Sequence, residues 1–369
     1  MAALSGHFHP VRFSELPGWD RDPVAQAYAA FRRSAHRTAE RPYRTGSLGV
    51  DALSFGHAFE QARRHPSLHG AAAKAFFETH FVPALVRSDP AEDGLVTGYY
   101  EPVVEASPVR TERFRVPLLR RPHDLVEIDD GNRPIGFDPA FAFGRQAGES
   151  LVEYFDRGEI ERGALAARDL ALAWVEHKVD AFFIHVQGCA RLRMPDGTET
   201  RITYAAKTGH PFTGAGRVLA ELGEIPLADV TMQSIRAWFH RNPQRIDEIL
   251  WRNRSYIFFR EAPVDAPDLG PIAAAKVPLT PGRSVAVDRL LHTFGTPFFI
   301  DAPTLTAFGG EPFRRLMIAQ DTGSAIVGPA RGDLFAGSGD AAGEIAGVVR
   351  HPADFYALLP RPLLERTRP

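Results

Sequence analysis

Apolar residues recur at helical intervals through residues 22–86. In DPVAQAYAAFRRSAHRTA, Tyr28 and Phe31 lie on one face of a helix, and Asp22 is expected to cap its N-terminus. GAAAKAFFETHF has a similar pattern, which Pro83 is expected to interrupt because a proline ring clashes inside a helix. We therefore predict a largely helical N-terminal region.

The pattern changes in the middle of the chain. GLVTGYYEPVVEAS, at 94–107, is β-branched, aromatic and interrupted by glycine, which is typical of strands and turns. ALAARDLALAWVEH (164–177) predicts a helix, and AFFIHVQGCARLRM (181–194) predicts an apolar strand after it. The turn PDGT at 195–198 then leads into TRITYAA, so we expect a hairpin there.

Residues 231–253 again favour a helix, with Thr231 as its N-cap. The rest of the chain contains short apolar segments separated by glycine and proline: SYIFFRE, SVAVD, TPFFID, RRLMIAQD and SAIVGP. We interpret each of them as a strand. The whole pattern predicts a mainly β protein with helices, in the α+β class, with one β-rich unit in the middle of the chain and another at its end.

Composition narrows the function classes. A chain of 369 residues suggests two domains, or one domain with an insertion. The formal charge of -2 gives no general attraction to nucleic acid or anionic lipid, so we expect no nucleic-acid partner. The single cysteine, Cys189, excludes an internal disulfide. We find no apolar run of about 18 residues and no secretory signal at the start, so no transmembrane helix is expected and membrane anchoring has no support.

Three aspartates stand in the glycine-rich segment from Ala319 to Gly347: Asp321, Asp333 and Asp340. Glycines let a backbone come close to a bulky, neutral sugar chain. A carboxyl that is shielded from water near other carboxylates has a raised pKa and can protonate a glycosidic oxygen. The segment is therefore compatible with a carboxyl acid and base on a loop of a β-barrel.

Three other interpretations of this segment stay open on its residues alone. DTGS at 321–324 is similar to the catalytic loop of aspartic proteases, although a second Asp-Thr/Ser-Gly does not occur in the chain. GSGDAAG at 337–343 is similar to a phosphate-binding loop, but too little chain follows it for the further strands of a Rossmann unit. Finally, aspartates in such segments often only stabilise turns.

Six motifs in a fixed order point to one family. They are TGYYEP (97–102), FFIHVQG (182–188), AKTGHPFTGAG (206–216), MQSIRAWF (232–239), NRSYIFF (253–259) and QDTGSAIVGPARGDLFAGSG (320–339). Together they resemble the membrane-bound lytic murein transglycosylase A family, and the likeness extends from FSELPGW near the N-terminus to FYALLP near the C-terminus. Any single motif is weak, whereas six in matching order are specific.

The resemblance implies a fold and a reaction. The family fold is a double-psi β-barrel interrupted by a smaller β-domain, which here corresponds to a barrel domain at 1–102 and 251–369 and an insertion at 103–250. A glycan strand of peptidoglycan is expected in the groove between them. The family cleaves the β-1,4 bond between N-acetylmuramic acid (MurNAc) and N-acetylglucosamine (GlcNAc) without adding water. It leaves 1,6-anhydro-MurNAc ends, and one aspartate acts first as acid and then as base.

The family motifs also imply roles for individual residues. Asp333 matches the catalytic aspartate, and Asp321 and Asp288 match supporting aspartates. Repulsion between the carboxyls is expected to raise the pKa of Asp333, and Arg331 to oppose that rise if it faces the same pocket. The resemblance further implies a substrate-binding group: Thr97, Tyr99, Tyr100, Glu101, Gln187, Gly188, Lys207, His210, Gly323 and Ser324.

Neither a metal nor another cofactor is expected. His65 and His69 are separated by a proline and lack an H-E-x-x-H pattern. Ser324 has no histidine placed by sequence as its base, so it is not expected to be a nucleophile. Ser324 and Val327 stand where the family often carries glycine and lysine, and contacts to a ligand at these positions are therefore expected to differ.

The family substrate lies outside the cytoplasm, so we expect the periplasm or the inner face of the outer membrane as the location. Peptidoglycan glycan strands are the expected partners, together with cell-wall synthesis proteins. Members of the family are typically exported and anchored through an acylated N-terminal cysteine, which is not visible at the start of this sequence. The alternative function is a non-catalytic glycan-binding or wall-assembly protein built on the same barrel.

Overall fold

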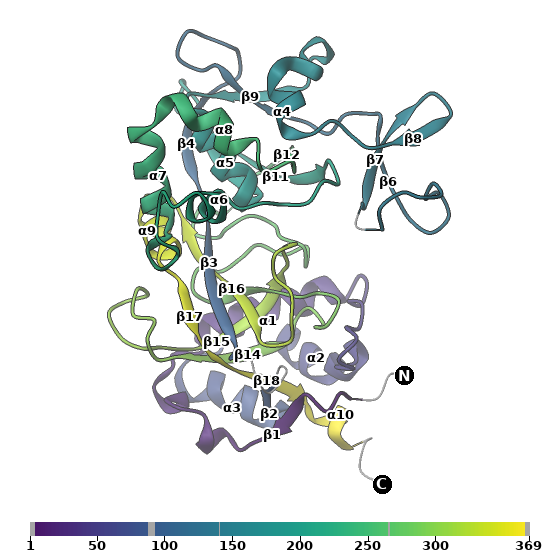
Figure 1. Ribbon diagram of the computed structural model, residues 1–369. Helices are drawn as coiled ribbons and strands as arrows, with labels where there is room; N and C mark the ends of the chain where they lie inside the picture. The colour runs from purple at the N-terminus through teal and green to yellow at the C-terminus, as the bar shows by residue number, and fades with distance from the viewer. Residues whose placement is uncertain (1–3, 88–92, 140, 265, 366–369) are drawn as a thin grey trace. The chain divides into compact units, whose positions relative to one another are not determined.

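The structure is a computed structural model, drawn as a ribbon in Figure 1. It describes four stretches of the chain: 4–87, 93–139, 141–264 and 266–365. Contacts within the chain divide it into two compact units, of which unit 1 consists of Met1–Tyr100 with Ala266–Pro369 and unit 2 of Glu101–Asp265. The sequence places the boundaries at 102/103 and 250/251, and the division into a catalytic barrel and a groove domain stays a prediction.

Both units contain helices and strands, so the fold is of the mixed α+β class. The described helices of unit 1 are α1 (Ala25–Thr38), α2 (Gly56–Arg64), α3 (Gly70–His80), α9 (Asp340–Gly347) and α10 (Arg361–Glu365). Those of unit 2 are α4 (Arg157–Glu159), α5 (Lys178–Gln187), α6 (Ala215–Glu221), α7 (Met232–Arg241) and α8 (Ile246–Leu250). Thr231 caps α7 as predicted, since its hydroxyl accepts a hydrogen bond from the Ser234 N–H at 3.0 Å.

A nine-stranded sheet runs through unit 1 in the order β1-β2-β18-β14-β15-β13-β16-β3-β17. Its strands are β1 (Phe8–Pro10), β2 (Phe81–Val86), β3 (Leu95–Glu101), β13 (Ser284–Val287), β14 (Pro297–Ala302), β15 (Phe313–Asp321), β16 (Arg331–Ser338), β17 (Arg350–Pro352) and β18 (Asp354–Pro360). Helix α1 contacts β15 and helix α3 contacts β2; Figure 1 shows these helices in purple and blue beside the sheet. The N-terminal helices therefore cover part of the sheet that carries the aspartates.

The core of unit 1 is rich in phenylalanine. Phe31 of α1 is fully buried and packs on four other aromatic rings, with centroid distances from 5.0 to 5.9 Å: those of Phe59, Phe76, Phe77 and Phe81. Each buried ring contributes about 2 kcal/mol through removal of apolar surface from water. The apolar face that the helical periodicity predicts therefore packs on helices α2 and α3 and on the start of β2.

Strand β13 lies between β15 and β16 and sets the register of both. It pairs in parallel with β15 and antiparallel with β16. Ala286 is the register partner of Asp321 in β15 and also of Asp333 in β16. The step from Val285 to Ala286 spans a β-bulge, in which Gln320 is the extra residue of β15.

Unit 2 contains a six-stranded sheet in the order β12-β11-β10-β4-β9-β5 and a three-stranded sheet in the order β6-β7-β8. Its strands are β4 (Val103–Ser107), β5 (Val116–Leu119), β6 (Leu125–Glu127), β7 (Phe143–Ala147), β8 (Ser150–Val152), β9 (Ala171–Val175), β10 (Cys189–Arg193), β11 (Glu199–Lys207) and β12 (Ile257–Ala262). Strands β10 and β11 pair in an antiparallel hairpin around residues 195–198, which confirms the predicted turn. Strands β3 and β4 confirm the extended structure predicted at 94–107.

The N-terminal helical pattern is confirmed, but the role predicted for Asp22 is wrong. Helix α1 begins at Ala25, and Asp22 does not cap it. The buried Asp22 carboxylate accepts hydrogen bonds from the Arg283 guanidinium at 2.7 and 2.9 Å and from the Leu316 N–H at 2.7 Å. Charge-assisted hydrogen bonds to a distant arginine thus replace the local cap.

The predictions at Pro83 and at 164–177 are also wrong. Helix α3 ends at His80, and Pro83 lies inside strand β2 rather than in an interrupted helix. Within 164–177, residues Ala171–Val175 form strand β9, which pairs with β4 and β5. Pairing on both sides outweighs the helix propensity of alanine and leucine there.

The strand predicted at 181–194 has the right position only in its second half. Residues up to Gln187 belong to helix α5, and Gly188 ends this helix with a left-handed conformation, φ 74°. Only Cys189–Arg193 is a strand. A short apolar run does not distinguish a buried helix from a buried strand, and the glycine was the signal that separates the two.

The C-terminal strands are predicted correctly except around the aspartates. SYIFFRE, SVAVD, TPFFID and RRLMIAQD form β12 to β15, whereas SAIVGP forms a turn. Asp333 lies in strand β16 instead of in a loop, and Asp340 begins helix α9. A Cβ at Gly332 would lie within 3.0 Å of Phe355 and Val285, so this glycine serves close packing of a strand.

Candidate active site

Two carboxyls meet on the sheet of unit 1. Asp321 is the last residue of β15, Asp333 is the third residue of β16, and Ala286 of β13 pairs with both. Paired residues point to the same face of a sheet, and neighbouring strands lie about 4.8 Å apart. The two carboxyls therefore lie on one face, on either side of Ala286.

The half-buried Asp333 carboxyl is bound by a threonine and lies near a guanidinium. Thr97 Oγ1, in β3, donates a hydrogen bond to Asp333 Oδ1 at 2.5 Å. Arg331 Nη2 donates to Thr97 Oγ1 at 2.8 Å. Shielding from water raises the pKa of Asp333 above its ordinary value, although the Thr97 hydrogen bond and the Arg331 charge both lower it. The opposition expected from Arg331 is therefore present, but burial outweighs it.

The contact between Arg331 and Thr97 fixes the direction of the threonine hydroxyl. A guanidinium N–H can only donate, so Thr97 accepts from Arg331 and points its own proton to Asp333 Oδ1. A protonated Asp333 then carries its proton on Oδ2, for which the described residues provide no hydrogen-bond partner. Arg331 is thus a positioning residue that acts on Asp333 through Thr97.

Asp321 is held by several donors. Tyr99 Oη donates to Asp321 Oδ2 at 3.0 Å, and the Ala274 N–H donates to Oδ1 at 3.2 Å. The pKa of Asp321 is raised to about 6 overall: burial is the largest cause and the Asp333 charge adds to it, whereas hydrogen bonds from the Thr322 and Ala274 backbone and from Tyr99 act in the opposite direction. Because the two carboxyls repel when both are charged, loss of a proton from one opposes its loss from the other.

Apolar side chains border this pair of carboxyls. Phe335, two residues after Asp333 in β16 and so on the same face, has no exposed surface, whereas Leu334 points to the opposite face and packs in the main core. Phe335 belongs to a small apolar cluster: Tyr99, Leu279, Ala286, Ile326 and Phe335. Such a border keeps water from the carboxyls and is the physical cause of their raised pKa values.

Gln320 anchors the end of β15 to helix α1. Its side chain is fully buried; Nε2 donates to the Ala30 carbonyl at 2.8 Å and to Ser34 Oγ at 2.9 Å, and Oε1 accepts from Ser284 Oγ at 2.6 Å. The amide is satisfied at both ends, so the bulge that precedes Asp321 is held in place. Gln320 is not among the residues that the sequence predicts. Its signal is a single polar side chain that ends the apolar run of β15.

Asp288 is buried and binds backbone N–H groups. Its Oδ1 accepts from the Leu290 N–H at 3.0 Å, and its Oδ2 accepts from the Gly328 N–H at 3.1 Å. It thereby ties the turn after β13 to the turn between β15 and β16. No hydrogen bond of the described residues joins it to Asp321 or Asp333, so a direct supporting role in the chemistry stays a prediction.

The other predicted residues of unit 1 differ in exposure. Gly323 and Ser324 are exposed in the turn that follows Asp321. Tyr100 is buried, and its ring lies so close to Gly343 that a Cβ there would come within 2.9 Å of it. The turn is therefore accessible to a ligand, whereas the Tyr100 ring packs inside the unit.

Glu101 is fully buried in unit 2. Its Oε2 accepts hydrogen bonds from Arg201 Nη2 at 3.0 Å and from Arg191 Nη2 at 3.2 Å, and its Oε1 accepts from Arg201 Nε. Two guanidiniums thus balance one carboxylate. With no exposed surface, this carboxylate joins strands of the sheet and does not present itself to a ligand.

The remaining predicted residues also belong to unit 2. Gln187 ends α5, Gly188 is its C-cap, and Lys207 ends β11; all three are partly exposed. Burial lowers the pKa of Lys207. His210 is buried, with Nε2 2.7 Å from the Tyr154 carbonyl oxygen. Gln187 and Lys207 therefore have surface that a ligand can contact, whereas the His210 ring is bound to the backbone.

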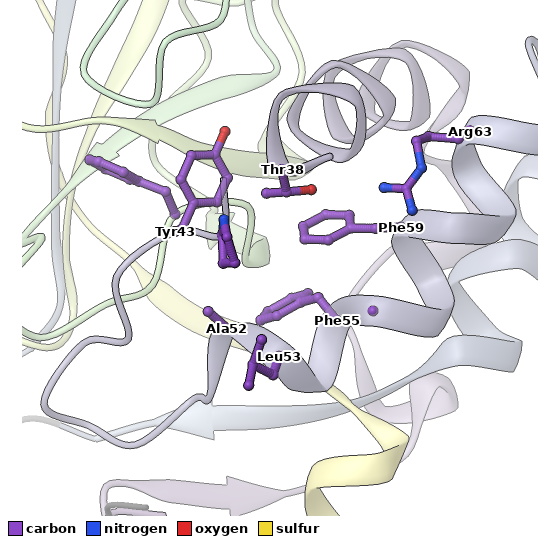
Figure 2. A pocket seen from close by; sticks show the side chains of 10 residues that line it. Thr38, Tyr43, Ala52, Leu53, Phe55, Phe59 and Arg63 are labelled. Carbon is purple, nitrogen blue, oxygen red and sulfur yellow. The ribbon is translucent and has the colours of Figure 1, made fainter. Parts of the chain in front are cut away.

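Unit 1 also has a cavity of about 130 Å³ away from these residues. Figure 2 shows Tyr43, Phe55, Phe59 and Leu53 around it, with Arg63 at its edge. None of the residues predicted for the site lines it. In the described part of the chain, no group of three or more His, Cys, Asp or Glu is placed to hold a metal ion, and no helix combines the length and hydropathy needed to cross a membrane.

Comparison with known proteins places this chain. The profile of the MltA specific insert domain matches residues 95–260, and that of the 3D domain matches residues 283–359. Membrane-bound lytic murein transglycosylase A of Escherichia coli (strain K12) is 32% identical over 271 residues, which cover 72% of this chain. A crystal structure of a membrane-bound lytic murein transglycosylase from Agrobacterium tumefaciens is 51% identical, covers 98% of this chain and 99% of its own, and has a TM-score of 0.91. The chain belongs to the lytic murein transglycosylase A family.

Other members of the lytic murein transglycosylase A family are similar over nearly the whole chain. MltA from Neisseria gonorrhoeae is 34% identical with a TM-score of 0.79, and covers 98% of this chain and 94% of its own. E. coli MltA with bound chitohexaose is 26% identical with a TM-score of 0.69, and covers 97% of this chain and 96% of its own. Among the curated relatives, the aligned part spans 66% of the E. coli sequence and 63% of the one from Vibrio cholerae.

Family membership decides between the interpretations of the glycine-rich segment. The 3D domain includes Asp288, Asp321 and Asp333, so this segment belongs neither to an aspartic protease nor to a Rossmann unit. The resemblance seen in the sequence is thereby confirmed.

Proposed function

We propose that this protein is a lytic transglycosylase that cleaves the β-1,4 MurNAc–GlcNAc bond of peptidoglycan and forms 1,6-anhydro-MurNAc ends. One observation carries the proposal: Asp333 has a raised pKa and an Oδ2 without a described partner, in the strand where the family motif expects the acid. The complex of E. coli MltA with chitohexaose supports an oligosaccharide as the ligand. Family membership supports peptidoglycan as its source.

In the proposed reaction, Asp333 gives its Oδ2 proton to the glycosidic oxygen while the bond from that oxygen to C1 of MurNAc breaks. The carboxylate then takes the proton of the C6 hydroxyl of the same MurNAc, whose oxygen forms the new bond to C1. The aspartate therefore ends the cycle protonated, and no water is consumed. Because the attacking group is part of the substrate, the second step loses little translational entropy.

The neighbours of Asp333 have distinct parts in this proposal. The Thr97 hydroxyl donates to Asp333 Oδ1 and leaves Asp333 Oδ2 for the substrate. Arg331 fixes the orientation of the Thr97 hydroxyl. Asp321, with a pKa of about 6, is largely ionised at neutral pH. Because repulsion between two carboxylates acts on both, an ionised Asp321 would oppose loss of the Asp333 proton and would favour the positive charge that develops at C1.

We also propose the finer features that the family implies. The nine-stranded sheet of unit 1 would be the double-psi β-barrel, with unit 2 as the groove domain. The exposed Gly323 and Ser324 and the partly exposed Gln187 and Lys207 would contact the glycan. The buried Tyr100, Glu101 and His210 would shape the site through packing. The location would be the cell envelope, at the periplasm or the outer membrane, with cell-wall synthesis proteins as further partners.

The experiment that tests the function is digestion of purified peptidoglycan in water enriched in ¹⁸O, with mass spectrometry of the products. A lytic transglycosylase gives anhydro-MurNAc ends that contain no ¹⁸O. Reducing ends labelled with ¹⁸O would instead show a hydrolase. Binding to peptidoglycan without any product would show the alternative, a non-catalytic glycan-binding or wall-assembly protein.

A further inference from the structure

Unit 1 contains a second pocket, which the proposed reaction does not use. Its volume is about 500 Å³, within the range typical of small-ligand sites. Two loops line it, one at 44–51 and the other at 289–294. Neither Asp321 nor Asp333 is part of its wall.

Two arginines give the lining of this pocket its positive charge. Arg44 and Arg289 both line it and are exposed, and in the described structure neither has a hydrogen bond or an ion pair. Asp51 also lines the pocket; its Oδ1 accepts from the Leu53 N–H at 3.2 Å and from Thr45 Oγ1 at 3.4 Å, and its Oδ2 has no hydrogen-bond partner among the described residues. With His292 neutral, because burial lowers the pKa of its ring to about 4, the lining carries one net positive charge.

The two loops are fixed to each other, so the pocket is preformed. The Ser47 N–H donates to the Leu290 carbonyl at 2.8 Å, and the Leu48 N–H donates to the Leu291 carbonyl at 3.1 Å. A Cβ at Gly46 would lie 2.2 Å from the Leu291 carbonyl oxygen, so the close approach of the loops requires glycine there. A ligand would therefore find the arginines on a backbone that is already ordered.

The same loop reaches the turn beside the catalytic pair. The Asp288 carboxylate bonds to the Gly328 N–H, and His292 Nε2 lies 2.8 Å from the Pro329 carbonyl oxygen. That turn connects Asp321 at the end of β15 with β16. The wall of the pocket thus rests on the segment that leads from one carboxyl to the other.

We propose that this pocket binds a carboxylate of the peptide stem carried by MurNAc. The inference rests on the proposed function, because it concerns the same substrate. Arg44 and Arg289 supply guanidinium donors for a carboxylate, and the exposed Ser47 supplies a hydroxyl. Leu290, 65% exposed, supplies an apolar surface for alanine methyl groups of the stem. After removal of the stem, MurNAc keeps only the carboxylate and methyl of its lactyl group, next to the sugar ring, whereas the stem carries carboxylates and alanine methyl groups further from the ring.

The test compares two substrates: uncross-linked glycan strands that carry peptide stems, and the same strands after an amidase has removed the stems. For the wild-type enzyme, we expect a KM about tenfold lower on the strands with stems. In the double variant Arg44→Gln/Arg289→Gln, the KM on strands without stems divided by the KM on strands with stems falls to about one. In the wild type the same KM ratio falls as the salt concentration rises, because salt screens exposed charges. Arg41→Gln is the matched control, since Arg41 is an exposed arginine of the same segment that does not line the pocket, and it keeps the ratio.

A binding arm separates this inference from the proposed function. A free tetrapeptide stem is titrated into the wild type and the double variant and followed by NMR, with the same peptide after amidation of its carboxyls, and with inorganic phosphate, as comparison ligands. Stem binding that is lost in the double variant and on amidation supports the inference even if no cleavage is found. Equal KM values of the wild type on both substrates, or phosphate binding without stem binding, would overturn it. Absence of cleavage of both substrates would count against the proposed function alone.

Discussion

Unit 1 and unit 2 each contain a carboxyl group that is shielded from water, and the two groups differ in their hydrogen-bond partners. In unit 2, Glu101 has no exposed surface and receives hydrogen bonds from two guanidiniums. In unit 1, Asp333 receives one hydrogen bond, from a neutral hydroxyl, and the nearby guanidinium bonds to that hydroxyl instead. Compensation of charge is nearly complete at Glu101 and incomplete at Asp333.

This difference shows that burial alone does not make a candidate acid. Both residues lie on or beside motifs that the family shares, yet a carboxylate clamped by two arginines has no proton to give. Incomplete compensation raises the pKa of Asp333 and leaves one oxygen open.

Replacement of Asp333 by Asn removes the proposed acid and base while it keeps the size of the side chain. We expect the rate of cleavage to fall by about 10³-fold, since general acid–base catalysis contributes at this scale. Binding of chitohexaose should persist, because we propose that other residues make the sugar contacts. Anhydro-MurNAc ends measured by mass spectrometry give the rate, and calorimetry gives the affinity.

Asp340→Asn is the control for that variant, because Asp340 is an exposed aspartate seven positions further along the chain, at the start of α9. It should cleave like the wild type. Substantial turnover of Asp333→Asn would contradict the assignment. Loss of turnover in Asp321→Asn together with retention in Asp333→Asn would move the role of acid to Asp321.

Glu101→Gln removes the charge of the carboxylate that the Arg191 and Arg201 guanidiniums bind. The two arginines would keep their charges without the carboxylate, and removal of one partner from a buried ion pair costs about 3–5 kcal/mol of the free energy of unfolding. Urea denaturation followed by circular dichroism measures this. Glu105→Gln is the matched control, since Glu105 pairs with Arg193 on the surface, where such pairs contribute about 0–1 kcal/mol. Equal losses of unfolding free energy in Glu101→Gln and Glu105→Gln would show that the buried ion pair contributes no more than the surface pair.

Asp321→Asn tests whether the active-site carboxyls cost stability. Burial raises the pKa of Asp321 to about 6, above its ordinary value of 3.8, so the folded state holds this proton more tightly than the unfolded chain. The stability contributed by Asp321 is therefore fully present below about pH 4 and lost as the pH rises through about 6. Asparagine has no proton to lose, so relative to wild type the variant should gain roughly 2–3 kcal/mol between pH 4 and pH 7.5. A difference that is independent of pH would show that the shift is absent.

Thr97→Val removes the hydroxyl that donates to Asp333. We expect cleavage to fall about tenfold, in line with the loss of one hydrogen bond to a charged group. Because that bond lowers the pKa of Asp333, its loss raises the pKa, and the limb of the pH–rate profile where the acid loses its proton moves to higher pH. Thr97→Ser should restore both rate and profile. A slower Thr97→Val enzyme with an unshifted profile would indicate a packing role only.

Much of the architecture could be predicted because it depends on local pattern. Helical periodicity identified the N-terminal helices, and turn residues identified the hairpin of β10 and β11. The errors arose where tertiary contacts outweigh local preference. Asp22 was expected to cap a helix and instead pairs with Arg283, and the glycines around Asp333 suggested a loop although Gly332 lets β16 pack closely.

The candidate site was predictable to a different extent. Motifs gave Asp321 and Asp333, because a family resemblance transfers residue identities directly. They did not show that Glu101 is enclosed by arginines, since membership of a motif says nothing about exposure. Nor did they show that Arg331 reaches Thr97, because these residues lie 234 positions apart and meet only through the pairing of β3 with β16.

The double pairing of Ala286 places a single methyl group as a spacer between the acids of β15 and β16. An uncharged residue thus lies between the two acids and separates them. A bulkier side chain at this position would wedge the two apart and weaken their mutual repulsion, and glycine would open a space for a water molecule. The acidity of the pair therefore depends on the volume of one small residue as well as on the two acids.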